Sequence, residues 1–231
     1  MPTKINSSGQ SLTQYDILVG AANNLVTNVA PGVATTVLTS NGVAADPTFQ
    51  AGGGGGGTFV LIETQTVGAP VSSLDFVTGI SSTYATYVLL LTNVKCVTNN
   101  SALYMRTSSN GGASYNSTGY NSGQTNFYQF SSNNSSQEIS TNSFILTNFC
   151  KNNLEGIFGQ CFLTGLPSGS MTSIIGKGTS SNMNNTQTSI NIYGGYSTNV
   201  NVNALRLFFA NSVGTPGNMS AGTVSLYGIA Q

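Results

Sequence analysis

Six consecutive glycines constrain the fold of this chain more than any other feature of its sequence. The run comprises Gly52, Gly53, Gly54, Gly55, Gly56 and Gly57. Glycine loses the most backbone entropy on folding and buries no side chain, so the run predicts a flexible hinge over residues 51–57. Its root-mean-square reach is about 12–15 Å. The hinge would separate an N-terminal attachment or shaft segment, residues 1–50, from a C-terminal domain, residues 58–231.

Charged side chains are scarce throughout the chain. They make up 5% of the residues, whereas ordinary globular domains contain about 25%. Six basic and six acidic residues give a net charge of zero, so no long-range field would attract nucleic acid or an anionic membrane. Eleven Phe and ten Tyr, within a hydrophobic content of 39%, are sufficient for a core. We therefore expect a folded protein that does not bind nucleic acid.

The same composition bears on cellular location. No stretch approaches the roughly 18 uninterrupted apolar residues of a transmembrane helix, so we expect no membrane insertion. The first ten residues have no apolar centre, and we expect no conventional secretory signal. Synthesis in a reducing cytosol would keep Cys96, Cys150 and Cys161 as free, buried thiols. A bridge between Cys150 and Cys161 across neighbouring strands is the alternative.

The C-terminal part alternates apolar and polar residues with the period of two that is typical of β-strands. Such runs occupy residues 58–67, 73–77, 86–94, 102–108, 143–148, 154–164, 171–177, 189–193, 205–210 and 223–229. None has the 3.6-residue period and capping pattern of a long helix. We predict an all-β fold, an antiparallel, jelly-roll-like β-sandwich. Residues 117–136 are rich in Asn, Ser and Gly, and we expect the loosest structure there.

The N-terminal part contains three short apolar runs, at residues 15–19, 25–29 and 35–39, which are separated by turn-forming residues. A segment of this size cannot bury much apolar surface alone. Self-association, as a homotrimer, would cover the apolar edges; disorder and a sheath on another protein are the alternatives. Neutral strand edges in the C-terminal part also favour a homo-oligomer, because neighbouring subunits would cover them.

Two stretches carry a family resemblance. Residues 16–29 (DILVGAANNLVTNV) and 36–50 (TVLTSNGVAADPTFQ) resemble shaft segments of bacteriophage tail fibres and related virion proteins. The C-terminal part, at residues 87–94, 106–112 and 221–229, looks like the β-sandwich domains attached to such proteins. The resemblance implies a fibre or spike subunit in the virion. Its N-terminal segment would bind other virion proteins, and its sandwich would bind a glycan or protein receptor on the host surface.

The alternative within the same class is a capsid-decorating or tail-assembly protein that does not bind a receptor. A secreted adhesin is a further alternative; the expected absence of a conventional signal argues against it, although specialised export could bypass that signal. The receptor-binding interpretation needs a recognition surface, for which the sequence offers one main candidate. Tyr115, Tyr120, Phe127 and Tyr128 lie in a polar, uncharged region, where rings can stack on sugars while amides and hydroxyls bind sugar hydroxyls. Alternatively, these rings lie on strands or at a subunit interface and pack against apolar neighbours.

Catalytic residues are hard to find. The chain has no histidine, which excludes Ser-His-Asp and Cys-His chemistry within one chain. Glycoside cleavage needs two carboxylates about 5–10 Å apart. Glu63, Asp75, Glu138 and Glu155 are scattered, and Asp75 stands between two apolar residues of a strand, so we expect it to face solvent. With no phosphate-loop or metal-ligand pattern either, we expect no enzyme, no cofactor and no metal site.

Overall fold

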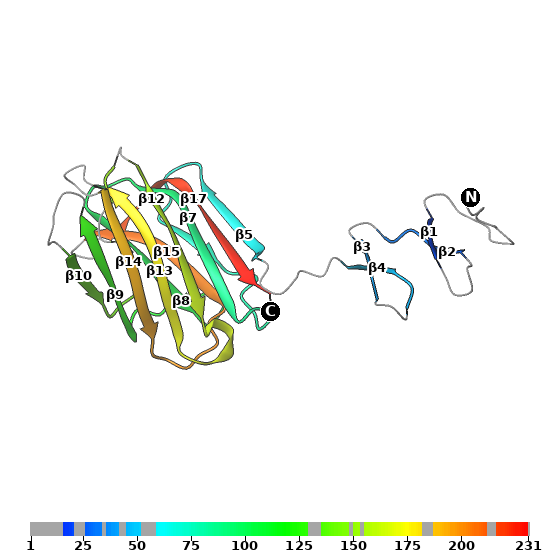
Figure 1. Cartoon of the computed structure of the whole chain (residues 1–231). Coiled ribbons are helices and arrows are strands. Elements are labelled where there is room, and N and C mark those ends of the chain that lie inside the picture. Colours follow the sequence, from blue (N-terminus) through cyan, green and yellow to red (C-terminus); the bar gives the residue numbers. More distant parts are fainter. Residues whose placement is uncertain are drawn as a thin grey trace. The chain divides into compact units, whose positions relative to one another are not determined.

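The chain divides into two compact units, Met1–Gly55 and Gly56–Gln231 (Figure 1). The structure, a computed structural model, describes residues 16–20, 26–33, 36–41, 45–51, 59–128, 135–147, 150–152, 155–181, 187–211 and 216–230. The division falls inside the run of six glycines. Residues 52–57 lie outside the described ranges, so the hinge stays a prediction.

The N-terminal unit contains two small antiparallel sheets. One pairs β1 (Ile17–Gly20) with β2 (Val26–Val29), and the other pairs β3 (Thr36–Thr39) with β4 (Thr48–Ala51). The first three strands coincide with the three apolar runs of the sequence. Leu18, Val37 and Leu38 are exposed. Since an isolated two-stranded sheet is marginally stable in water, the described part of this unit has little to stabilise it alone.

The C-terminal unit is a sandwich of two antiparallel sheets (Figure 1). The larger sheet has the order β10 (Ser135–Ser140), β9 (Tyr120–Tyr128), β14 (Gln187–Tyr196), β13 (Thr172–Ser181), β12 (Ile157–Thr164), β7 (Thr86–Cys96), β17 (Met219–Ile229), β5 (Phe59–Val67). The smaller sheet has the order β11 (Phe144–Thr147), β8 (Ser101–Ser108), β15 (Ala204–Asn211), with β6 (Ser73–Phe76) and β16 (Pro216–Gly217) both pairing with β15. One short 3-10 turn, Leu166–Ser168, follows β12.

The strand order is that of a jelly roll with two insertions. Eight strands form the frame: β5-β17-β7-β12 in one sheet and β6-β15-β8-β11 in the other. This double-sheet arrangement of eight strands is the jelly roll. The hairpin β13–β14 is inserted after β12, and β9–β10 after β8, and together they widen the larger sheet. The prediction of an all-β, antiparallel, jelly-roll-like sandwich is confirmed.

The core lies between the two sheets and follows the alternation of the strands. Its fully buried side chains include Phe76, Tyr87, Leu89, Leu103, Phe144 and Phe209. Each such side chain contributes about 1.5–3 kcal/mol through the area it removes from water. The nearly continuous apolar run at the start of the central strand β7 favours a strand that is buried on both faces. Its outward-facing Val88 is buried, but the next outward residue, Leu90, is 38% exposed, so the expectation is wrong at that position.

Residues 117–136, where we expected the loosest structure, contribute the strand β9. The prediction is wrong there because the inward face of β9 is polar: Ser122, Gln124 and Asn126 are all buried. A hydroxyl on this face has a structural task. The Oγ of Ser122 accepts a hydrogen bond of 3.0 Å from the backbone N–H of Ile145. Ile145 belongs to β11, the last strand of the smaller sheet, so a side chain of one sheet satisfies the backbone of the other.

The cysteines differ from expectation. Cys96, at the end of β7, forms a disulfide with Cys150, which follows β11; their Cα atoms are 6.0 Å apart. Both the expectation of three free thiols and the alternative pair Cys150–Cys161 are therefore wrong. The fold brings together two residues that are 54 positions apart, which spacing alone does not reveal. Cys161 is free and buried in β12, and burial raises the pKa of its thiol to about 12.

Candidate functional site

The four aromatic residues predicted as a binding site do not come together. Tyr120 belongs to the core and is 4% exposed. Its ring packs against Phe144 and Tyr196, with centroids 5.0 and 4.8 Å away. Its hydroxyl accepts a 2.9 Å hydrogen bond from the backbone N–H of Thr107, and burial raises its pKa. A ring enclosed in this way offers no face to a ligand, so the prediction of a binding role is wrong for Tyr120.

Tyr115 lies instead beside an ion pair of the smaller sheet. The guanidinium of Arg206 stands 4.1 Å from the centre of the Tyr115 ring. Arg206 donates two hydrogen bonds, of 2.7 and 2.6 Å, to the carboxylate of Asp75. Burial, followed by the negative charge of Asp75, raises the pKa of Tyr115. Asp75 is partly exposed, as expected, but the sequence did not reveal its partner.

The other two residues lie on β9. Phe127 is 49% exposed on the outer face of the larger sheet. The backbone of Tyr128 pairs with Thr188 of β14, and its side chain, like that of Glu138, lies outside the described residues. Among the predicted residues whose side chains the structure describes, Phe127 is the one with a largely exposed ring that a ligand could contact.

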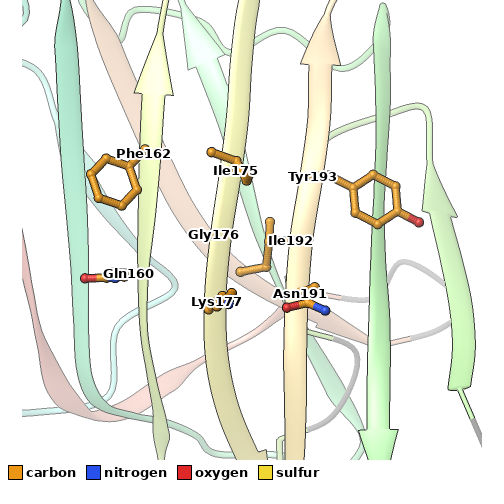
Figure 2. A pocket seen from close by; sticks show the side chains of 8 residues that line it. All are labelled: Gln160, Phe162, Ile175, Gly176, Lys177, Asn191, Ile192 and Tyr193. Atoms are coloured by element: carbon orange, nitrogen blue, oxygen red, sulfur yellow. The ribbon is translucent and has the colours of Figure 1, made fainter.

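A groove of about 540 Å³ opens on the outer face of β12, β13 and β14 (Figure 2). Its volume is within the range of about 300–1,000 Å³ that is usual for ligand sites. The described residues that line it are Gln160, Phe162, Ile175, Gly176, Lys177, Asn191, Ile192 and Tyr193. Predicted strand positions supply all of them, but the sequence did not indicate that they form one site.

Strand register arranges the polar lining residues in one row. Gln160 of β12 pairs with Lys177 of β13, and Lys177 pairs with Asn191 of β14. Neighbouring strands are about 4.8 Å apart, so the three side chains span roughly 10 Å across the sheet. Two carboxamides thus flank one ammonium group, and together they offer several hydrogen-bond donors and two acceptors.

An apolar row runs beside the polar one. Phe162, Ile175 and Tyr193 pair across the same three strands, two residues further along. Ile175 is 67% exposed and Tyr193 38% exposed. Tyr193 lies opposite Gly123 of β9, which has no side chain to crowd the ring. The groove therefore combines aromatic rings with hydrogen-bonding side chains on strands that are about 4.8 Å apart.

A glycine sits below this face. A Cβ on Gly176 would lie 2.5 Å from the backbone oxygen of Gln160 and 2.8 Å from the sulfur of Cys161. Only a residue without a side chain allows β12 and β13 to approach so closely here. Gly176 thereby fixes the relative position of the two strands that carry Gln160 and Lys177.

The titratable side chains among the described lining residues are Lys177 and Tyr193, and these lining residues include no carboxylate and no thiol. No group of three or more His, Cys, Asp or Glu side chains gathers in the described ranges. Within the same ranges, no helix is long and apolar enough to cross a membrane.

The outer face of the larger sheet, groove included, carries many exposed apolar side chains. Seven of its large hydrophobic side chains are exposed: Phe59, Leu61, Leu90, Phe127, Phe158, Ile175 and Tyr193. Large exposed apolar side chains in this number on one face are typical of surfaces that contact another molecule. The groove occupies the part of this face where polar side chains interrupt the apolar ones.

No family model, curated protein or solved structure matches this chain.

Proposed function

We propose that this chain is a fibre or spike subunit of a bacteriophage virion, and that its sandwich binds a glycan of the host surface. The observation that carries the binding role is the groove on β12–β14. There, the row Gln160, Lys177 and Asn191 stands beside the exposed ring of Tyr193 and the half-buried ring of Phe162. A sugar presents apolar C–H faces, which pack on rings, and hydroxyls, which pair with carboxamides. A saccharide meets both needs.

The virion role rests on the resemblance of residues 16–29 and 36–50 to fibre shafts. The exposure of Leu18, Val37 and Leu38 supports self-association of this unit, because apolar side chains on marginal two-stranded sheets gain stability from a neighbouring copy. In this proposal three copies form the shaft, the N-terminal unit contacts other virion proteins, and each sandwich carries one groove.

A second candidate is a capsid-decorating or tail-assembly protein whose sandwich contacts only other virion proteins. The exposed Phe59, Leu61 and Leu90 favour it, because they lie outside the groove and provide an apolar contact surface. In that case substitutions at these three positions would impair virion assembly, and substitutions in the groove would have no effect on attachment.

The test is a glycan-array screen of the full chain and of the variant Tyr193→Ala. Phe127→Ala is the matched control, because it removes an exposed ring from the same face outside the groove. We expect the wild type and Phe127→Ala to bind the same saccharides, and Tyr193→Ala to lose binding at least tenfold. Equal binding by all three proteins, or no binding by the wild type, would contradict the proposal.

A further inference from the structure

Lys177 is the charged residue among the described residues that line the groove. It is exposed on β13, and its direct neighbours across the strands are the neutral amides Gln160 and Asn191. An opposite charge at either position would stabilise the sheet. Neither position carries one, so the sheet leaves the ammonium group of Lys177 without a carboxylate across the strands.

Lys177 takes part in no ion pair within the described ranges. The ion pair found there joins Arg206 to Asp75 in the smaller sheet. This matters in a chain with only six basic residues. The positive charge of Lys177 stands at the middle of the polar row, between Gln160 and Asn191, where a bound molecule can contact it.

We propose that the groove selects an anionic saccharide, with the acidic group of the sugar on the ammonium of Lys177. This inference rests on the proposed glycan binding and names its ligand class. Hydroxyls flanking the acidic group would pair with Gln160 and Asn191, and the sugar ring would lie against Tyr193. Lysine acts as a compact point charge rather than a planar fork. The site therefore accepts a uronic-acid carboxylate and a sugar sulfate alike.

The experiment compares charged saccharides with neutral ones of the same backbone, using the full chain and calorimetry. One pair is oligogalacturonate and its methyl ester, and the other is a sulfated galactan oligosaccharide and its unsulfated form. The variants are Lys177→Gln and Lys177→Arg. Lys95→Gln is the matched control, because it removes the same charge from β7 outside the groove.

We expect Lys177→Gln to weaken binding of a charged member about tenfold, the effect of losing one charge-assisted hydrogen bond. Binding of the neutral members should change less than about twofold, Lys177→Arg should retain most of the preference, and Lys95→Gln should behave as wild type. The two charged members show whether carboxylate or sulfate is preferred. Higher salt should reduce the preference, because the ammonium group is exposed to solvent.

Two outcomes separate the inference from the proposed function. If wild type binds charged and neutral members equally, or Lys177→Gln weakens both equally, the anionic preference is overturned while glycan binding stands. If wild type binds no saccharide on an array that includes these probes, the proposed function fails. Because Lys177 is exposed, the thermal unfolding of Lys177→Gln should match wild type and confirm that the variant is folded.

Discussion

Arg206 of β15 lies directly opposite Arg106 of β8. Like charges in this position destabilise a sheet, and these two are the only arginines of the chain. Asp75 holds Arg206 with two hydrogen bonds. Arg106 stands 4.9 Å from the ring centre of Phe208 and donates a 3.1 Å hydrogen bond from its Nε to the backbone oxygen of Asn142. One arginine is thus neutralised by a carboxylate, while the other is positioned by a ring and a carbonyl group.

Asp75→Asn should lower the free energy of unfolding by about 1 kcal/mol at low ionic strength. The variant removes a partly exposed ion pair and leaves two opposed positive charges. Added salt should reduce the deficit, because it screens their repulsion. Denaturant unfolding at two salt concentrations measures both effects. The control Glu155→Gln removes an exposed carboxylate elsewhere and should change little; equal effects of the two variants would contradict the assigned role of Asp75.

Cys150→Ser should lower the free energy of unfolding by about 2–4 kcal/mol, because the bond to Cys96 closes a loop of 54 residues in the unfolded chain. Guanidinium unfolding with and without a reductant provides the measurement. Wild type should lose stability on reduction, whereas the variant should not respond. A Cys161→Ser variant should still respond to the reductant. Indifference of the wild type to reduction would argue against the bond.

Cys161 predicts a dependence of stability on alkaline pH. Burial raises the pKa of its thiol to about 12, while a thiol in the unfolded chain titrates near 8.5. Between these values the folded state holds a proton that the unfolded state has lost. The free energy of unfolding therefore falls as pH rises from about 9 towards 12. Cys161→Ala should flatten this fall by up to about 1.4 kcal/mol per pH unit.

Part of the alkaline fall should persist in Cys161→Ala. Burial also raises the pKa values of Tyr87 and Tyr120, so both contribute above about pH 10, the ordinary tyrosine value. Both proteins should therefore lose stability above about pH 10, and between about pH 9 and 12 the slope for wild type should exceed that for Cys161→Ala by the contribution of the Cys161 thiol. Parallel profiles throughout would show that Cys161 does not titrate differently in the two states.

Gly176→Ala should lower the free energy of unfolding by about 1–3 kcal/mol, because the new Cβ would force β12 and β13 apart. Gly195→Ala is the matched control on β14, where the nearest heavy atom to a new Cβ is 3.8 Å away. It should be close to neutral. If the glycan proposal is correct, Gly176→Ala should also weaken binding at temperatures where it remains folded, since it moves Gln160 relative to Lys177.

Shortening the run of residues 52–57 to two glycines should leave the thermal unfolding of the sandwich unchanged and impair attachment or assembly of the virion. A six-residue Gly/Ser replacement keeps the reach of about 12–15 Å and should behave as wild type. Loss of sandwich stability on shortening would mean that the glycines belong to its architecture. A mass measurement on the same proteins checks the expected homotrimer, which a monomer at micromolar concentration would contradict.

Alternation in the sequence was enough to predict the sandwich wherever one face of a strand is apolar. β7 and β15 are examples, because apolar side chains such as Leu89 and Leu207 occupy their inward positions. Alternation does not predict β9, because buried polar side chains occupy most of its inward positions. Ser122 is buried there because it binds the backbone of another strand, and no hydrophobic pattern records such a contact. The disulfide was missed for a related reason, since chain distance does not show which strand ends meet.

The binding site was harder to anticipate than the fold. The aromatic content of residues 115–128 suggested recognition, but one residue there, Tyr120, fills the core. The groove depends on register: Gln160, Lys177 and Asn191 are neighbours only because three strands pair with particular offsets. Spacing alone predicts that Ile175 and Lys177 share one face of their strand, because they are two residues apart. The same holds for Asn191 and Tyr193. Their alignment with β12 requires the folded sheet.

The groove is formed partly by the frame of the jelly roll and partly by an inserted hairpin. Gln160 belongs to the eight-stranded frame of the jelly roll, whereas Lys177 and Asn191 belong to the inserted hairpin β13–β14. The outward residues of that hairpin can be exchanged while its inward residues, such as Ile174 and Ile192, keep the sandwich packed. If the glycan proposal is correct, ligand preference can therefore change through substitutions in one hairpin while the frame stays unaltered.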